Sequence, residues 1–292
     1  MFAGIILVKT GLLKKEDQHV LIVLLLDVAM PCVVINSFLK VEYTPEIRNG
    51  FILMLIAGTL VQGFVILVTR LVRKPFHLTD VEEGSIEYCN AGALMIPLIQ
   101  AVLGDEWVVY TATFLCVQNF YLWTHGVSLI SRTPQTKLKK LIKNPNLVAI
   151  ALGAVLFIIH CPLPDILRET MDNAGSMAGP LCMLSTGMIM ADVDLKKIFL
   201  NVRIYFIIFL KMIVLPLLCI AIMKYTPLST VTANADQIMM ILTMIMAAPS
   251  ANLITQWAAL YDNEPDYAGS IGVATTLVCI LTIPLMVHIF QM

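Results

Sequence analysis

The sequence predicts an all-α integral membrane protein whose ten transmembrane helices form two inverted repeats of five helices. Three observations lead to this prediction. Hydrophobic residues make up 59% of the 292 residues, charged residues make up 13%, and the mean hydropathy is +0.85, far outside the range of a soluble domain. Apolar runs recur along the whole chain, and certain proline and polar residues recur at matching positions in its two halves.

Ten apolar runs follow one another, separated by short polar segments. A helix that spans the bilayer needs about 20 mostly apolar residues, and the first run has barely half of them. It also lacks the basic residues and the small-residue cleavage site of a signal peptide. We therefore expect either a start codon farther upstream or a shortened first helix. The runs cover residues 1–13, 19–39, 50–72, 84–104, 107–131, 145–161, 170–191, 200–223, 236–260 and 267–291.

The basic residues of the loops predict the topology. With the N-terminus placed outside, fourteen Lys and Arg residues fall in cytoplasmic loops and four fall on the opposite face. The positive-inside rule therefore places both termini outside. The cytoplasmic set is Lys9, Lys14, Lys15, Arg70, Arg73, Lys74, Arg132, Lys137, Lys139, Lys140, Lys143, Lys196, Lys197 and Arg203, and the opposite set is Lys40, Arg48, Arg168 and Lys224.

Matched positions at a nearly constant spacing indicate an internal repeat. Because each half has five spans, an odd number, the second half must be inverted relative to the first, as in many secondary transporters. We assign residues 1–131 to the first repeat, 132–144 to a cytoplasmic linker and 145–292 to the second repeat. The matched pairs are Pro31 with Pro180 and Gln62 with Lys211, each 149 residues apart, and Pro97 with Pro249, 152 residues apart.

The fourth and ninth runs are poor continuous helices. The fourth contains Asn90 and Pro97, and the ninth contains Pro249 and Asn252. A proline removes a backbone donor and clashes with the preceding turn, so each helix should break near its proline. Unpaired backbone is tolerated within a membrane only where protein or a water-filled cavity satisfies it. Two such breaks in equivalent positions of inverted repeats predict a substrate site near the middle of the membrane, where helix N-termini favour an anion.

Polar side chains inside the spans are candidates for function because they are costly in lipid. Asp27 and Lys211 could form a buried pair whose protonation changes during transport, or a purely structural strut. Uncharged side chains that suit a carboxylate or hydroxyl ligand could instead join helices. His125 and His288 fit interfacial positions better than a proton relay. The uncharged candidates are Asn36, Gln118, Asn119, Tyr121, Ser185 and Asn252.

Other classes of function find little support. The seven cysteines are scattered through apolar runs without metal-ligand spacing, so we interpret them as packing residues and expect no metal and no cofactor. The sequence has no HExxH, no GxSxG and no paired intramembrane Asp, which argues against an enzyme. Net charge is near zero, which does not favour nucleic acid as a partner.

Several segments together resemble the auxin efflux carrier family. They are PCVVINSFL in the second run, the Asn-x6-Pro stretch with PLIQAVLG in the fourth, KNPNLVAIALG in the sixth, GPLCMLSTGMIMA in the seventh and AAPSANLITQWAALYDNEPDYAGSIGVATTLVCILTIPL at the end. The resemblance implies ten spans with the fourth and ninth helices crossing at the substrate site. It implies that Asn90, Pro97 and Pro249 line that site, and more weakly Asn36, Gln118, Tyr121 and Ser185. Two departures stand out: the glycine usual shortly before the fourth-helix proline is absent, and the first helix is short.

These features together predict a secondary transporter of a small organic anion, a carboxylate or dicarboxylate, that works by alternating access. The resemblance implies a mobile bundle that moves against a scaffold of the first, second, sixth and seventh helices. The short loop between the halves favours a prokaryotic carrier in a bacterial inner membrane. The alternatives are a sodium-coupled symporter of the bile-acid type and a non-transporting sensor. The expected partners are the lipid bilayer and the anion, with a homodimer left open.

Overall fold

A computed structural model describes residues 2–14, 17–39, 44–133, 145–159, 163–191, 201–225 and 232–292. The described chain is helical, and its sole β-type pairing there is one isolated bridge. Four of its helices are long and apolar enough to cross a membrane: residues 18–36, 45–76, 202–225 and 265–291. Shorter apolar helices cover residues 91–103, 148–159 and 235–246. The protein is therefore an all-helical, multi-pass membrane protein, as the composition predicts.

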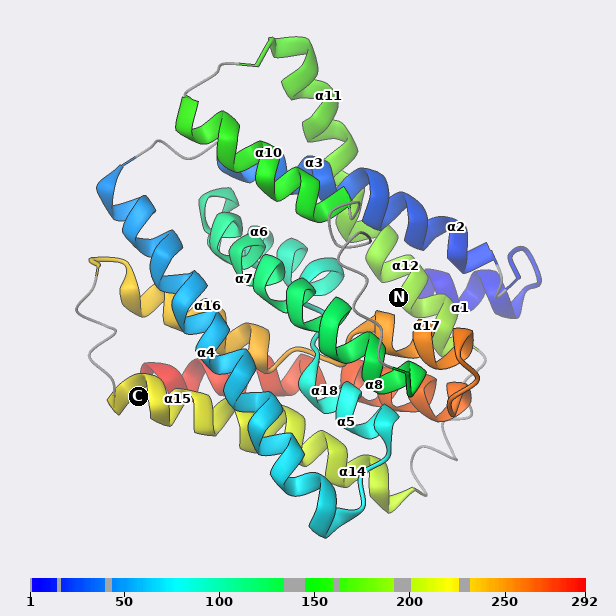
Figure 1. The fold of residues 1–292 in the computed structure, drawn as a ribbon. Coiled ribbons are helices and arrows are strands. Elements are labelled where there is room, and N and C mark those ends of the chain that lie inside the picture. The colour runs from blue at the N-terminus through cyan, green and yellow to red at the C-terminus, as the bar shows by residue number, and fades with distance from the viewer. Residues whose placement is uncertain are drawn as a thin grey trace.

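The first group of helices comes from both halves of the sequence. Helix α10 packs along α3, α1 packs along α12, and α11 contacts α3, so these helices lie together on one side of the molecule (Figure 1). The group contains the first, second, sixth and seventh apolar runs, which is the set expected to form the scaffold. Its members are α1 (Phe2–Lys9), α2 (Gln18–Val23), η2 (Leu24–Ala29), α3 (Met30–Leu39), α10 (Pro145–Ile159), α11 (Asp165–Ser176) and α12 (Ala178–Ala191).

The second group contains the remaining described helices. Helix α4 packs against α7, α16 contacts both α4 and α18, and α17 packs against α18. The two groups meet mainly where α7 and η3 contact α3, α10 and α12. The members of the second group are α4 (Pro45–Phe76), α5 (Asp80–Glu87), η3 (Ala91–Met95), α6 (Ile96–Leu103), η4 (Asp105–Trp107), α7 (Val108–Tyr121), η5 (Leu122–Gly126), α8 (Val127–Ser131), α14 (Val202–Phe209), η6 (Leu210–Val214), α15 (Leu215–Tyr225), α16 (Ala235–Met246), α17 (Asn252–Leu260) and α18 (Pro265–Gln291).

A network of charged side chains ties together one end of the second group. Arg73 of α4 pairs with Asp80 at 2.6 Å, and Arg132 pairs with the same carboxylate at 2.7 Å. Arg203 of α14 holds Glu82, which also accepts a hydrogen bond from Tyr267. The loop YDNEPDYA joins this network, because its Asn263 accepts a hydrogen bond from Arg132 and donates one to the Ile130 carbonyl. The loop that carries much of the family resemblance thus fixes the end of α8.

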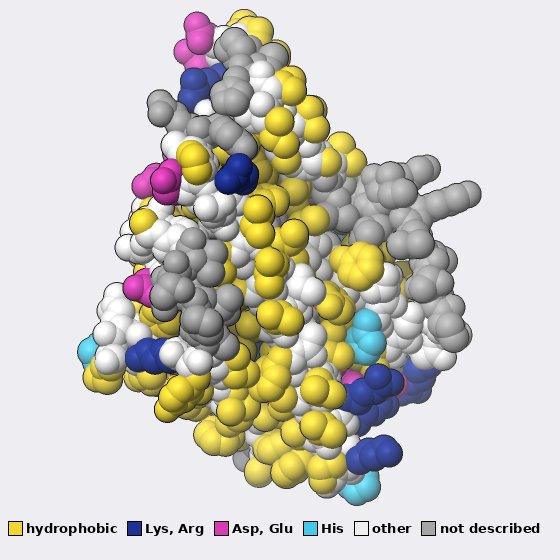
Figure 2. Space-filling model, turned by 60° about the vertical axis from the view of Figure 1, so that its left-hand side comes forward, with side chains coloured by type: hydrophobic (Ala, Val, Ile, Leu, Met, Phe, Trp, Pro, Cys, Tyr) yellow, Lys and Arg dark blue, Asp and Glu magenta, His cyan; other side chains and the backbone are white. Residues whose placement is uncertain are grey.

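The surface agrees with a lipid environment. On the face shown in Figure 2, hydrophobic side chains form a broad continuous area, and most charged side chains lie toward its margins. Large apolar side chains such as Leu60, Leu67 and Leu71 of α4 are more than half exposed. In water such an area would be costly, whereas lipid tails solvate it.

Replacing Gly4 by alanine should destabilise the first group. A Cβ atom on Gly4 would lie 2.2 Å from the Leu184 carbonyl oxygen of α12, a backbone atom that cannot move alone. We expect a loss of about 1–3 kcal/mol in unfolding free energy, seen as a lower thermal midpoint in detergent. Gly63→Ala is the matched control, because its Cβ would meet only Tyr121 at 3.8 Å. Equal midpoints for the two variants would contradict the close approach of α1 and α12.

Candidate functional site

Two interrupted helices cross and pair through their backbones. Helix α5 ends at Glu87 and the chain resumes as η3 at Ala91, while α16 ends at Met246 and α17 begins at Asn252. Between these ends, Cys89 and Ser250 form an antiparallel bridge. The Asn90 amide donates to the Pro249 carbonyl at 2.9 Å, and the Ala251 amide donates to the Tyr88 carbonyl at 3.0 Å. Each break thus satisfies part of the backbone that the other exposes, as a membrane interior requires.

The first break lies farther from its proline than the sequence predicts. The residues outside the helices are 88–90, whereas Pro97 lies inside a helix that runs continuously from Ala91 to Leu103 through the π-helical turn η3 and α6. Proline is tolerated within a membrane helix where a local π-helical turn adjusts the backbone hydrogen bonds. Pro97 instead packs near Gly179 of α12, at the contact between the two groups. The second break contains Pro249, as predicted.

Two polar side chains cap the end of α5. Gln62 Nε2 donates to the Glu87 carbonyl at 3.1 Å, and Lys211 Nζ donates to the Ile86 and Tyr88 carbonyls, each at 3.1 Å. The last carbonyls of a helix have no intrahelical donor and carry partial negative charge, so an ammonium group is a favourable partner. Gln62 and Lys211 are the pair that the repeat spacing matched, and the structure brings both to the same helix end.

A cavity of about 380 Å³ lies beside the crossing, between the two groups. Of the predicted residues, five line it: Asn90, Gln118, Asn119, Asn252 and Asp27. Pro97, Pro249, Asn36, Tyr121 and Ser185 do not appear in its lining, although the Pro249 carbonyl supports Asn90 from behind. The other lining residues are Ile22, Leu25, Leu26, Met30, Cys89, Ala91, Gly92, Ala93, Leu115, Leu122, Trp123, Pro145, Ala251, Leu253 and Gln256.

Gln118 reaches the cavity wall, but its amide is occupied. Gln118 Nε2 donates to the Cys89 carbonyl at 2.8 Å, and Oε1 accepts from the Cys89 amide at 3.3 Å and from Sγ at 2.8 Å. Its geometry therefore suits clamping the extended segment more than binding a ligand. The Tyr121 hydroxyl lies near Gly63 of α4, and its carbonyl accepts from Tyr88. Ser185 is buried within the first group.

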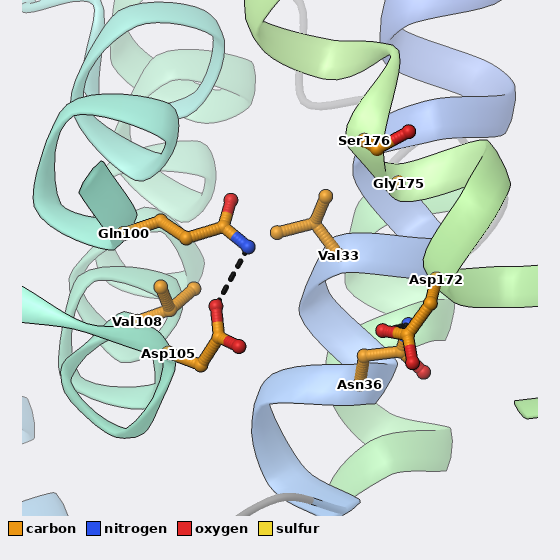
Figure 3. Close-up of a pocket in the computed structure, with 8 residues that line it drawn as sticks. All are labelled: Val33, Asn36, Gln100, Asp105, Val108, Asp172, Gly175 and Ser176. Carbon is orange, nitrogen blue, oxygen red and sulfur yellow. Dashed lines mark hydrogen bonds between the residues drawn. The ribbon is translucent and has the colours of Figure 1, made fainter. Parts of the chain in front are cut away.

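Asn36 lies in a separate pocket of about 270 Å³ (Figure 3). Its Nδ2 donates to Asp172 Oδ1 at 3.0 Å. On the opposite wall Gln100 Nε2 donates to Asp105 Oδ1 at 2.7 Å. Two carboxylates face this pocket, which makes it a poor place for an anionic ligand.

Asp27 and Lys211 do not face one another in the structure. Lys211 is buried and bonded to the carbonyls of α5, whereas the exposed Asp27 lies on the cavity wall within η2. No ion pair between described residues joins them. A role of Asp27 and Lys211 in proton coupling stays a prediction, but an ion pair between the two residues does not support it.

The cavity offers an anion several donors. Residues 91–93 begin η3 and residues 252–253 begin α17, and the first amides of a helix have no intrahelical acceptor. Asn90 and Asn252 add side-chain amides next to these two helix ends. The buried Trp123 Nε1 has no hydrogen-bond partner among the described residues, and its ring packs edge-on against Trp257 at 5.1 Å. Backbone amides and side-chain amides suit a carboxylate.

The sequence did not predict one pair of titratable side chains, Glu87 and His125. Glu87, the last residue of α5, is fully buried, and its Oε2 lies 3.3 Å from His125 Nδ1 of η5. An acidic residue within the fourth run was the available signal, but its position near the start of that run resembles an ordinary helix end. The position of His125 in the second half of its apolar run favours an interfacial histidine, and its partner Glu87 lies 38 positions earlier in the sequence.

The chain matches a family model along nearly its whole length. The model is described as membrane transport protein, and the match covers residues 1–287. No curated protein matches the chain. The full-length match agrees with the segments that carry the resemblance, which are distributed from the second run to the last.

Proposed function

Because the chain belongs to the membrane transport protein family, that of the auxin efflux carriers, we propose that it carries a small organic anion across the membrane by alternating access. The observation that carries the proposal is the cavity at the crossing, where the N-terminal ends of η3 and α17 and the amides of Asn90 and Asn252 come together. Partial positive charge at helix N-termini favours negative charge in the space between them.

The proposed architecture is ten spans in two inverted repeats, residues 1–131 and 145–292, joined by a linker at 132–144. It is supported by the two interrupted helices at their crossing and by the convergence of Gln62 and Lys211 on the end of α5. Most of the linker lies outside the described residues. We also propose a bacterial inner-membrane location with both termini outside, in line with the distribution of basic residues.

The division into two groups supports the proposed movement. The cavity is lined on one side by α2, η2 and α3 of the first group, and on the other by the crossing and α7 of the second. Movement of the second group against the first would open the cavity to alternate sides of the membrane. The charged network of Arg73, Asp80, Arg132 and Glu82 joins only elements of the second group, so it would travel with that group as a unit.

We expect transport to be independent of sodium. Discontinuous helices often coordinate sodium through the carbonyls at their C-terminal ends. Here the Lys211 ammonium occupies that position on α5. The test is uptake of labelled malonate, malate and indole-3-acetate into proteoliposomes, with sodium or choline as the only added cation. Uptake at equal rates in both salts supports the proposal. Uptake that requires sodium would favour a bile-acid-type symporter, and no uptake of any compound would favour a sensor.

A further inference from the structure

Glu87 occupies a site that disfavours its ionised form. Its side chain has no exposed surface, and neither carboxylate oxygen makes a hydrogen bond with a described residue. It also ends α5, where the helix dipole places partial negative charge. An ionised carboxylate without hydrogen bonds in a low-dielectric interior is costly, so binding a proton relieves an unfavourable charge.

His125 connects this carboxylate to the surface. Its Nδ1 lies 3.3 Å from Glu87 Oε2 and 2.9 Å from the Tyr88 hydroxyl, which itself donates to the Tyr121 carbonyl. The imidazole side chain is 30% exposed, whereas that of Glu87 is 0% exposed. Histidine exchanges protons near neutral pH more readily than other side chains. His125 can therefore take up a proton from water and pass one from Nδ1 to Glu87 Oε2, which leaves the imidazole neutral and the carboxyl uncharged.

The charges around Glu87 do not neutralise it permanently. Lys211 is bonded to carbonyls at the end of α5, and Glu83, which adds negative charge, is paired with Arg73. Among the described residues, the titratable and charged groups that interact with Glu87 are Arg70 from α4, Glu83 and Tyr88 from its own segment, His125 from η5 and Lys211 from η6.

We infer that Glu87 and His125 form a proton-binding site that loads a proton together with the anion, so that the protein is a proton-coupled carrier. The inference rests on the proposed function. Cys89 and Asn90, two and three residues beyond Glu87, line the cavity, so an ionised Glu87 repels an anion bound there and a protonated Glu87 does not. Linkage then requires that the anion raise proton affinity by the same factor by which the proton raises anion affinity.

The test is malonate transport by the purified full chain in proteoliposomes that contain a pH-sensitive dye. The wild type should move protons with malonate, and its apparent malonate affinity should rise by up to about tenfold per unit fall in pH, over a range where malonate stays a dianion. Glu87→Gln should carry malonate without protons and with no dependence on pH. Glu169→Gln, the same change at an exposed site on α11, should behave as the wild type. Proton movement that persists in Glu87→Gln would overturn the inference, and so would malonate transport without protons in the wild type.

A second measurement decides the case if Glu87→Gln does not fold or malonate is not carried. The pH-difference infrared spectrum of the wild-type chain in detergent should show the band of a buried carboxyl that gains a proton. His125→Gln should shift the pH at which this band appears, because Glu87 loses its nearest titrating partner. A band whose midpoint is the same in the wild type and in His125→Gln, or its absence from the wild type, would contradict the inference. Neither result decides whether an anion binds at the crossing, which a separate experiment tests.

Discussion

Asn90→Ala should lower transport of sub-saturating anion by about ten- to a hundredfold while leaving membrane insertion intact. The Asn90 backbone bridges the crossing, donating to the Pro249 carbonyl and accepting from the Met95 amide, and these bonds survive the substitution. Its side chain contributes an amide to the cavity wall beside the first amides of η3. Loss of a donor from a desolvated anion site costs about 1.5–3 kcal/mol, a reduction of about ten- to a hundredfold in anion affinity.

The measurement for Asn90→Ala is uptake of the best substrate into proteoliposomes, normalised to inserted protein. Asn173→Ala is the control, because Asn173 is an exposed residue of α11 that is not part of the cavity lining. Uptake at the wild-type rate by correctly inserted Asn90→Ala would show that the Asn90 side chain is not part of the anion site.

Lys211→Met should both destabilise the fold and stop transport. Methionine fills a similar volume but leaves the Ile86 carbonyl without the ammonium donor, and the Tyr88 carbonyl then keeps only the Ala251 amide. Each buried acceptor left unpaired costs about 1–3 kcal/mol, and the extended segment at residues 88–90 loses part of its support. We expect a lower thermal midpoint together with loss of uptake.

Lys224→Met is the matched control for this substitution, because Lys224 is an exposed residue farther along the same span. It should leave both the midpoint and uptake at wild-type values. A Lys211→Met protein as stable and as active as the wild type would show that the ammonium does not hold the crossing.

The sequence predicted features that depend on local composition. Membrane class follows from long apolar runs, and a broken ninth helix follows from Pro249 because a proline disrupts the helix in which it stands. The first break lies at residues 88–90 and not at Pro97, because the π-helical turn η3 accommodates this proline within the helix, and Gln118 and Lys211 bind the carbonyls of the open segment. Those supports come from other helices, so no local pattern reveals them.

Side-chain partners were the least predictable part of the site. Asp27 and Lys211 were matched as opposite charges in apolar runs, but Lys211 binds backbone carbonyls instead. Asn36 was transferred to the substrate site by resemblance, yet it bonds to Asp172 in another pocket. In each case the partner is set by which helix faces lie together, and this depends on packing of the whole chain.

Anion binding to the purified chain tests the central claim most directly. A ligand that binds the folded state at a hundred times its dissociation constant stabilises it by about 2.7 kcal/mol. Among malonate, malate and indole-3-acetate, at least one should raise the thermal midpoint of the wild type, and its neutral amide should not. The same anion at the same concentration should stabilise Asn90→Ala by only about 0.4–1.4 kcal/mol. A midpoint that no anion changes, or one that rises equally in the wild type and in Asn90→Ala, would contradict an anion site at the crossing.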